Sequence, residues 1–273
     1  MELKFTVNNK EYKCDSSTPL IISIPMIFNG DQPNTYDVKK ATAKAYEKDG
    51  FIGDTRKGGG CNFEQCNFIA HCNGTHTECV GHISLERISI HDTLKDSLIA
   101  STLITVNPEK AFDATDQYIP EKNAEDLIIT KSIVEKKINN LEMDFLEGLI
   151  IRTLPNDDTK KSRRYMENQA PYFSIEAMEY IVSLNVKHLL IDLPSVDRTF
   201  DDGKLTAHHI FWNVPFDSHD INIKNHSMKT ITEMIYASKE IEDGKYLLNI
   251  QFPEFEADAA PSRILLYELK NVD

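Results

Sequence analysis

The chain lacks any long hydrophobic run, although apolar residues are common in it. They make up 41% of the 273 residues, yet no stretch approaches the ~20 apolar residues that cross a bilayer. The N-terminus is no secretory signal either, because Met1 to Val7 alternates polar and apolar residues and ends at an Asn8-Asn9 turn. We therefore expect an N-terminal β-hairpin and no membrane partner.

Basic residues are fewer than acidic ones, and cysteines are few. The 30 Lys and Arg face 43 Asp and Glu, for a net charge of −13, and no basic run offers the clustered charge that a nucleic-acid backbone requires. Five cysteines without a secretory signal favour the reducing cytoplasm. Repeats, low-complexity tracts and linkers are absent, so we predict one domain over residues 1–273, with a hairpin extension at 1–17.

One segment is dense in metal-binding groups. It runs from Cys61 to His82 (CNFEQCNFIAHCNGTHTECVGH) behind a triple-glycine loop. Cys72, His76, Glu78 and His82 are separated by even numbers, so in an extended strand their side chains would share a face, whereas on a helix they would diverge. One thiolate, one carboxylate and two imidazoles suit zinc or a similar divalent ion better than calcium or magnesium.

A structural zinc site is the alternative reading of this segment. It would use Cys61, Cys66, Cys72 and Cys79 together with histidines. The spacing lacks the paired C-x-x-C motifs typical of such sites. The pattern therefore favours an open, catalytic site.

The end of the segment, CNGTHTECVGH, resembles the H-x-G-T-H-x-D-x-P-x-H signature of the metal-dependent cyclase family, which includes bacterial kynurenine formamidases and isatin hydrolase. His76 and His82 match histidines of the signature, and Glu78 stands where the family has aspartate. Two positions depart from it. Cys72 takes the place of the first histidine, with His71 one residue too early, and a valine replaces the proline.

Further motifs follow in the family's order, so that the resemblance covers about residues 18 to 273. They are IDLPSVD at 191–197, Ala207-His208-His209, Ile231-Thr232-Glu233, and DAAPSR at 258–263. His208 and Glu233 lie farther apart than in the family. We infer an insertion near residues 211–229, which contains Trp212 and can reshape the substrate pocket.

The resemblance implies a divalent metal cofactor, zinc or manganese, with one or two ions per chain. The implied ligands are Cys72, His76 and Glu78 for the first ion and Glu78, His208 and Glu233 for the second. His82 would be the catalytic acid or base, and His71 is the reserve ligand if Cys72 does not bind. His209 is expected to be a packed histidine rather than a ligand.

The resemblance also implies an α/β fold of the swivelling β/β/α cyclase type, with mixed, partly parallel sheets and flanking helices. The pattern agrees, since a strand at 149–153, a helix capped by Ser174 and a strand at 188–193 form a right-handed crossover with parallel pairing. Other elements are expected as strands at 18–28, 97–106, 246–250 and 263–269 and a helix from Thr130 to about Leu141.

Function follows from the same resemblance. We predict a hydrolase that cleaves a carbon–nitrogen bond of a small-molecule amide, with an aryl formamide such as N-formylkynurenine as the substrate type. A cyclic amide or lactone hydrolase and a catalytically degenerate metal-binding or assembly protein are the alternatives. The family is commonly oligomeric, so a homodimer or higher homo-oligomer is expected.

Three further positions carry weaker expectations. Tyr36 is the aromatic residue nearest to the family's entrance loop, so it is a candidate substrate contact or an ordinary loop residue. Asp192, at the end of its strand, either faces a ligand or caps the next turn. The charged loop at 156–164 is expected to be a solvated surface turn rather than an anion site.

Overall fold

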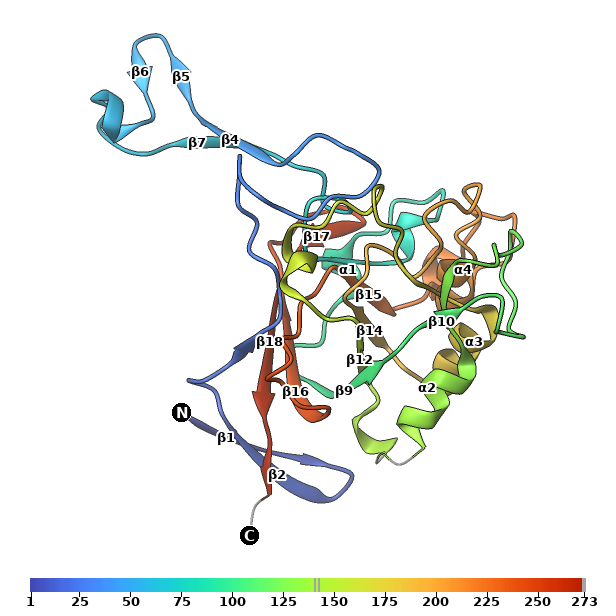
Figure 1. Cartoon of the computed structure of the whole chain (residues 1–273). Helices are drawn as coiled ribbons and strands as arrows, with labels where there is room; N and C mark the ends of the chain where they lie inside the picture. The colour runs from blue at the N-terminus through green and yellow to red at the C-terminus, as the bar shows by residue number, and fades with distance from the viewer. Residues whose placement is uncertain (140, 142, 272–273) are drawn as a thin grey trace.

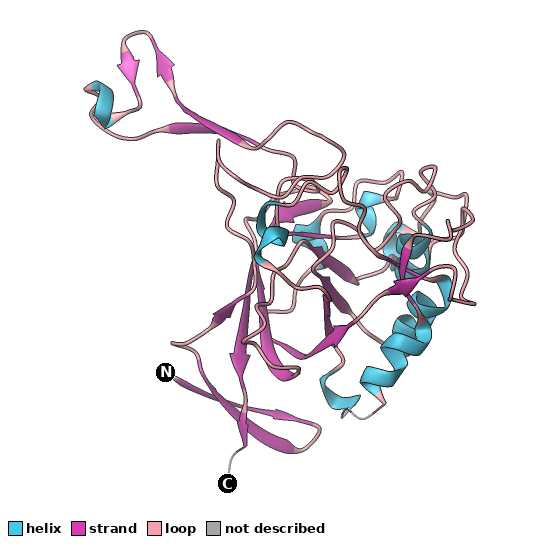
Figure 2. Ribbon diagram, viewed as in Figure 1, coloured by secondary structure: helices cyan, strands magenta, loops and turns pink. Residues whose placement is uncertain are grey.

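The computed structural model describes residues 1–139, 141 and 143–271 and is organised around one large mixed sheet (Figures 1 and 2). In spatial order its strands are β17 (Ala259–Pro261), β8 (His76–Glu78), β15 (Thr230–Glu233), β14 (His188–Ile191), β12 (Gly148–Thr153), β9 (Ile99–Val106), β16 (Gly244–Gln251), β18 (Arg263–Glu268) and β3 (Leu20–Ile21). The four neighbours from β15 to β9 run parallel, and the flanking pairs are antiparallel. The predicted mixed, partly parallel α/β architecture is confirmed.

Helices cover one face of this sheet. They are α1 (Ile90–Thr93), α2 (Lys131–Ile138), α3 (Ile175–Ser183) and α4 (Thr206–Trp212), with α2 and α3 side by side (Figure 1). The Ser174 hydroxyl accepts from Ala177 N at 2.9 Å and starts α3 as expected. The parallel pairing of β12 with β14, on either side of α3, is also as predicted.

Smaller sheets lie at the periphery. The N-terminal hairpin pairs β1 (Glu2–Val7) with β2 (Lys10–Asp15), and β19 (Lys270–Asn271) adds to β2. The turn residues Asn8 and Asn9 have positive φ values of 44° and 64°, a conformation that asparagine tolerates. A third sheet joins β10 (Glu109–Lys110), β11 (Leu127–Ile129) and β13 (Tyr172–Phe173).

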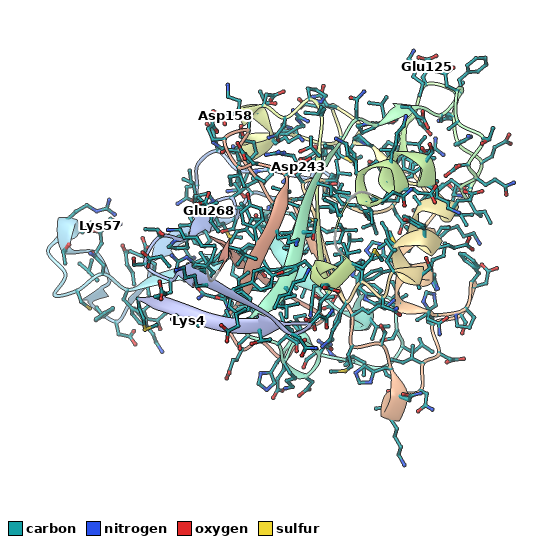
Figure 3. All side chains as sticks on the ribbon, turned by 90° about the horizontal axis from the view of Figure 1, so that it is seen from below. Lys4, Lys57, Glu125, Asp158, Asp243 and Glu268 are labelled. Atoms are coloured by element: carbon teal, nitrogen blue, oxygen red, sulfur yellow. The ribbon has the colours of Figure 1, made fainter. Side chains whose placement is uncertain are left out.

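A thin arm projects from the body between β3 and β8 (Figure 1). Its elements are β4 (Thr42–Ala45), β5 (Glu47–Lys48), β6 (Phe51–Ile52), the 3₁₀ turn η1 (Thr55–Lys57) and β7 (Glu64–Asn67). Figure 3 shows Lys57 at the outer end of the arm, on the opposite side of the molecule from Glu125. The rings of Tyr46, Phe51 and Phe63 pack together near this end.

Two expected elements are shorter than predicted. The strand expected at 18–28 is paired only at Leu20–Ile21 and at an isolated bridge from Ser23, because Pro25 has no N–H to donate and the chain then turns away into the arm. The helix expected to end near Leu141 ends at Ile138, and its predicted last turn includes Asn140, which lies outside the described residues. Within the described residues, no helix has the length and apolarity needed to span a bilayer.

The charged loop at 156–164 is exposed along most of its length, as predicted for a solvated turn, but one of its lysines is buried. Lys160 is buried there, 2% exposed, and its ammonium donates to Asp192 Oδ2 at 2.7 Å and to the Thr153 carbonyl at 2.7 Å. Asp192 also accepts from the backbone and hydroxyl of Thr153. Asp192 therefore ties the ends of β12 and β14 together and faces no open cavity.

Asp192→Ala is expected to lower the free energy of unfolding by about 3–5 kcal/mol, because it leaves the Lys160 charge buried without its counter-ion. Urea denaturation at neutral pH measures this loss. Lys161→Ala removes an exposed lysine from the same loop and should cost less than about 1 kcal/mol. An equal loss of unfolding free energy in the two variants would show that the buried Lys160–Asp192 pair stabilises the fold no more than an exposed lysine does.

Candidate metal centre

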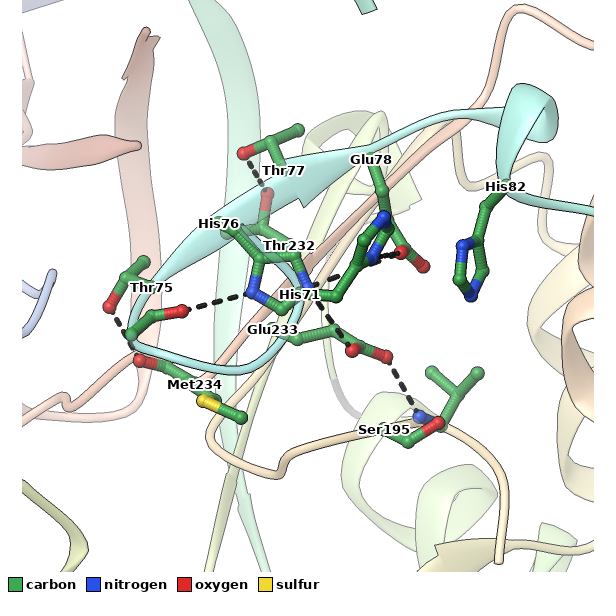
Figure 4. A network of polar contacts seen from close by, with 12 residues as sticks. His71, Thr75, His76, Thr77, Glu78, His82, Ser195, Thr232, Glu233 and Met234 are labelled. Atoms are coloured by element: carbon green, nitrogen blue, oxygen red, sulfur yellow. Dashed lines mark hydrogen bonds and ion pairs between the residues drawn. The ribbon is translucent and has the colours of Figure 1, made fainter. Parts of the chain in front are cut away.

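The centre begins with two adjacent antiparallel strands. In the register of β8 with β15, His76 stands opposite Glu233 and Glu78 opposite Ile231. Because alternate strand residues share a face, His76, Glu78 and Glu233 point to the same side, as Figure 4 shows. On the other face, the hydroxyls of Thr77 and Thr232 lie 2.9 Å apart and hold the register.

His76 is oriented as a ligand. Its Nδ1 lies 2.9 Å from the Gly74 carbonyl oxygen, which can only accept, so in the neutral ring Nε2 carries a lone pair. That Nε2 is buried, has no hydrogen-bond partner in the described part of the chain, and lies 3.5 Å from Glu233 Oε2. A buried lone pair facing a carboxylate is costly unless a cation joins them.

Glu78 is the central carboxylate. Its Oε1 accepts from His208 Nε2 at 2.8 Å, whereas Oε2 lies 2.9 Å from His71 Nδ1 without the geometry of a directed hydrogen bond. Burial by itself raises the pKa of Glu78, but the charges of His82 and His208 hold it well below its usual range. Each oxygen of Glu78 therefore faces a different histidine.

Glu233 is a second buried carboxylate beside Glu78. Its Oε1 accepts from the Val196 N–H at 3.0 Å. Burial and the negative charge of Glu78 raise the pKa of Glu233. Glu78 and Glu233 can therefore both be ionised only when a positive charge lies at the centre.

His208 reaches the cluster from α4 and is oriented by Asp197. The Asp197 carboxylate accepts from His208 Nδ1 at 2.5 Å and from the Ala207 N–H at 2.6 Å. This arrangement directs Nε2 of His208 toward Glu78. Although burial opposes it, hydrogen bonding to Asp197 and Glu78 raises the pKa of His208 well above its ordinary value.

His71, His82 and Asp258 form the outer wall. Asp258 Oδ2 lies 2.8 Å from His71 Nε2 and 3.5 Å from His82 Nδ1, and the two imidazoles stack at 4.2 Å. His82 ends the 3₁₀ turn η2 (Val80–His82). This turn depends on Gly81, where a Cβ would lie 2.0 Å from the Ile88 carbonyl oxygen.

Contacts with histidines balance the negative charge of the carboxylates in this wall. Although burial by itself lowers it, the carboxylates of Asp258 and Glu78 raise the pKa of His71 to about 10. The same contacts with His71 and His82 hold the pKa of Asp258 below its ordinary value. A divalent cation could replace these imidazolium protons and leave the carboxylates paired.

The donors fit a divalent metal ion. Within the described residues, the ligand atoms of His71, His76 and Glu78 lie within 4.8 Å of one another, and so do those of Glu78, His82 and His208. The two groups share Glu78. Imidazole and carboxylate donors with buried, unpartnered atoms on His76 and Glu78 form a set that suits a transition metal.

The structure brings together most of the residues expected from the sequence. His76, Glu78, His82, His208 and Glu233 meet at the centre, and His209 packs beside it with Nδ1 3.2 Å from the Val214 carbonyl. His71, the reserve ligand, takes a place in the cluster that Cys72 does not. Asp197 and Asp258 were not singled out, although both lie inside motifs of the sequence, IDLPSVD and DAAPSR.

No cysteine joins these groups within the described residues. Cys61 and Cys66 are exposed on and beside the arm, and Cys79 is buried apart from them. Burial, and then the charge of Glu233, raise the pKa of the Cys72 thiol to about 11. This geometry does not favour the alternative of a four-cysteine structural zinc site.

Comparison with known proteins gives a family and a fold. A profile of the family described as "Putative cyclase" matches residues 14–198. A structure described as a predicted metal-dependent hydrolase from Bacillus stearothermophilus is 15% identical, with a TM-score of 0.57 over 92% of this chain and 98% of that one. Isatin hydrolase A from Labrenzia aggregata is 11% identical, with a TM-score of 0.59 over 92% and 93%. No curated protein sequence matches the chain.

His71→Ala is expected to lower the affinity for a divalent ion by at least about tenfold, the loss usual even for an outer partner of a metal site. Cys72→Ala should retain its metal, because the thiol is not part of the cluster. Elemental analysis of untagged protein, followed by zinc titration of chelator-treated protein, compares the two variants. Loss of metal in Cys72→Ala with retention in His71→Ala would reverse the assignment.

Proposed function

The chain belongs to the cyclase family, and from this membership and the buried Nε2 of His76, which has no hydrogen-bond partner among the described residues, we propose that it is a metal-dependent hydrolase of a carbon–nitrogen bond. The buried lone pair of His76, 3.5 Å from Glu233 Oε2, is the observation that carries the proposal. Such a pair is satisfied when a cation lies between its members.

We assign the ligands in two sets that share Glu78. The first set is His71, His76 and Glu78, with His71 in place of Cys72, and the second is Glu78, His208 and Glu233. Zinc or manganese is the proposed metal, with one or two ions per chain, since imidazole suits zinc and carboxylate suits manganese. When bound, the metal supplies Lewis acidity that polarises a carbonyl and makes water nucleophilic near neutral pH.

His82 is the proposed proton carrier. It is 27% exposed, unlike the buried His76 and His208, so it can face both the cluster and an incoming substrate. Asp258, 3.5 Å from its Nδ1, and the stacked ring of His71 hold the imidazole in place. A proton on His82 would be delivered to the departing nitrogen as the amide bond breaks.

The proposed substrate is an aryl amide of the N-formylkynurenine type. Tyr36 supports an aromatic ligand, because its ring is half exposed, and burial together with the charge of Glu233 raises its pKa to about 12. An ion pair of 2.7 Å between Asp37 and Arg164 anchors the loop that carries it. A cyclic amide is the second candidate, favoured by the likeness of the fold to isatin hydrolase A.

We also propose a homodimer or higher homo-oligomer, without a nucleic-acid or membrane partner, in the cytoplasm. The arm supports self-association. At its end, Phe51 and Phe63 are 43% and 54% exposed although their rings contact each other. Exposed aromatic residues on a thin projection gain the apolar contact they lack when a second copy covers them.

His82→Ala is expected to lower turnover of an amide by about 10²–10⁴-fold, the usual contribution of a positioned acid or base, while metal content stays close to that of the wild type. Glu233→Ala should reduce both turnover and metal. The assay pairs a linear aryl formamide with a cyclic amide, and His91→Ala serves as the control histidine.

Full activity in His82→Ala would remove this histidine from the mechanism. A wild-type protein that is folded and loaded with metal but turns over neither amide would instead indicate a degenerate binding protein. The two failures are distinguishable because the first is seen with a wild type that turns over an amide, whereas in the second the wild type turns over neither amide.

The double substitution Phe51→Ser with Phe63→Ser is expected to shift the protein from oligomer to monomer, because it removes the apolar contacts of the arm. Light scattering coupled to size-exclusion chromatography measures the mass against the 31.1 kDa of one chain. Phe112→Ser, which changes a residue 79% exposed elsewhere on the surface, should leave the mass unchanged. An unchanged oligomer in the double variant would place the contact on another surface.

A further inference from the structure

The segment that follows α4 lines an open cavity of about 630 Å³. Its walls include Val80, Phe211, Trp212, Asp220, His226 and Lys229. This segment coincides with the insertion expected near 211–229. The volume falls within the range typical of small-molecule sites.

The cavity has fixed walls. The indole N–H of Trp212 donates to the Lys229 carbonyl at 3.0 Å and so joins the two ends of the segment. His219, in its middle, is tied to the body, with Nδ1 2.7 Å from the Ile83 carbonyl and its own carbonyl accepting from Leu85 N at 2.9 Å. These contacts fix the position of the segment relative to the core, so that the cavity is already formed without a ligand.

Two polar atoms of the wall lack a hydrogen-bond or ion-pair partner among the described residues. The Lys229 ammonium makes no ion pair or hydrogen bond within the described chain, lies 5.0 Å from the centre of the Phe211 ring, and has its pKa lowered by burial. His226 donates from Nδ1 to the Ile223 carbonyl at 2.8 Å, so Nε2 is an acceptor, and it is buried without a partner among the described residues. Asp220 is exposed to solvent.

None of the residues of the metal cluster lines this cavity. Trp212 separates the two, because its ring lies 5.1 Å from that of His208 and also forms part of the cavity wall. Val80, which follows Glu78 by two residues in the chain, also lies in the cavity wall. A molecule in the cavity would therefore contact the far side of the side chains that support the metal centre, without contacting the metal.

We propose that this cavity is a second ligand site, which takes a small carboxylic acid with an aromatic or branched apolar body. The carboxylate would pair with Lys229, and the partly exposed side chains of Val182, Ile221 and Met228 would contact the body. A hydroxyl or amine on the acid would donate to His226 Nε2. The proposal does not depend on the hydrolase activity, since it uses none of the residues of the metal centre.

Mandelate is a suitable probe, because it combines a carboxylate, a phenyl ring and a hydroxyl donor. Trp212 is the single tryptophan of the chain, so a change in its fluorescence on titration reports occupancy of its cavity. The neutral mandelamide should bind at least about tenfold more weakly, as expected for loss of one charge-assisted hydrogen bond. Phenylacetate, which lacks the hydroxyl, should bind with intermediate affinity.

Lys229→Met is expected to weaken mandelate binding by about tenfold or more, whereas Lys224→Met, on the exposed side of the same segment, should not change it. Because mandelate could also bind the metal centre, His71→Ala is titrated in parallel. Binding that survives in His71→Ala and is lost in Lys229→Met supports the proposed site. Binding that is lost in His71→Ala alone, or equal affinity for mandelate and mandelamide, or no saturable binding at millimolar concentration would overturn it.

Discussion

The pairing of β8 with β15 is the constraint on which the rest of the centre depends. It sets His76 opposite Glu233, so two residues far apart in the chain meet across one pair of strands. A slip of one residue would turn either side chain to the opposite face. Thr75 restrains this register, since its hydroxyl donates to the Met234 carbonyl at 2.5 Å and accepts from Ile24 N at 2.8 Å.

The other ligands are added to this pair by separate parts of the fold. The crossover through α3 leads to the turn after β14, where Asp197 accepts both from the start of α4 and from the ring of His208. The C-terminal part of the sheet supplies Asp258, just before β17, which pairs with β8. The centre is thus assembled at the junction of the parallel strands with the antiparallel strands β8 and β17, and its charges balance only when all of these parts are in place.

The surroundings of the centre are asymmetric. On one side, the Tyr36 ring is half exposed, and burial and the charge of Glu233 raise the pKa of its hydroxyl. The other side is closed by Trp212, behind which the 213–229 segment lines an open cavity. Trp212 lies between this cavity and His208, whose ring is 5.1 Å from the indole.

The sequence by itself determined the local elements and most of the donor set. Apolar runs identified the parallel core strands at 149–153 and 188–193, and Ser174 marked the start of its helix, because these features depend on neighbours in the chain. The motifs that resemble the cyclase family named His76, Glu78, His82, His208 and Glu233. Only the tertiary structure placed His71 among the clustered ligand atoms of the described residues, since the loop before β8 brings its Nδ1 to 2.9 Å from Glu78 Oε2. Tertiary contacts likewise buried Lys160 against Asp192, shortened the strand at Pro25 and formed the cavity behind Trp212. Each of these outcomes depends on residues that are distant in sequence, which periodicity and spacing do not encode.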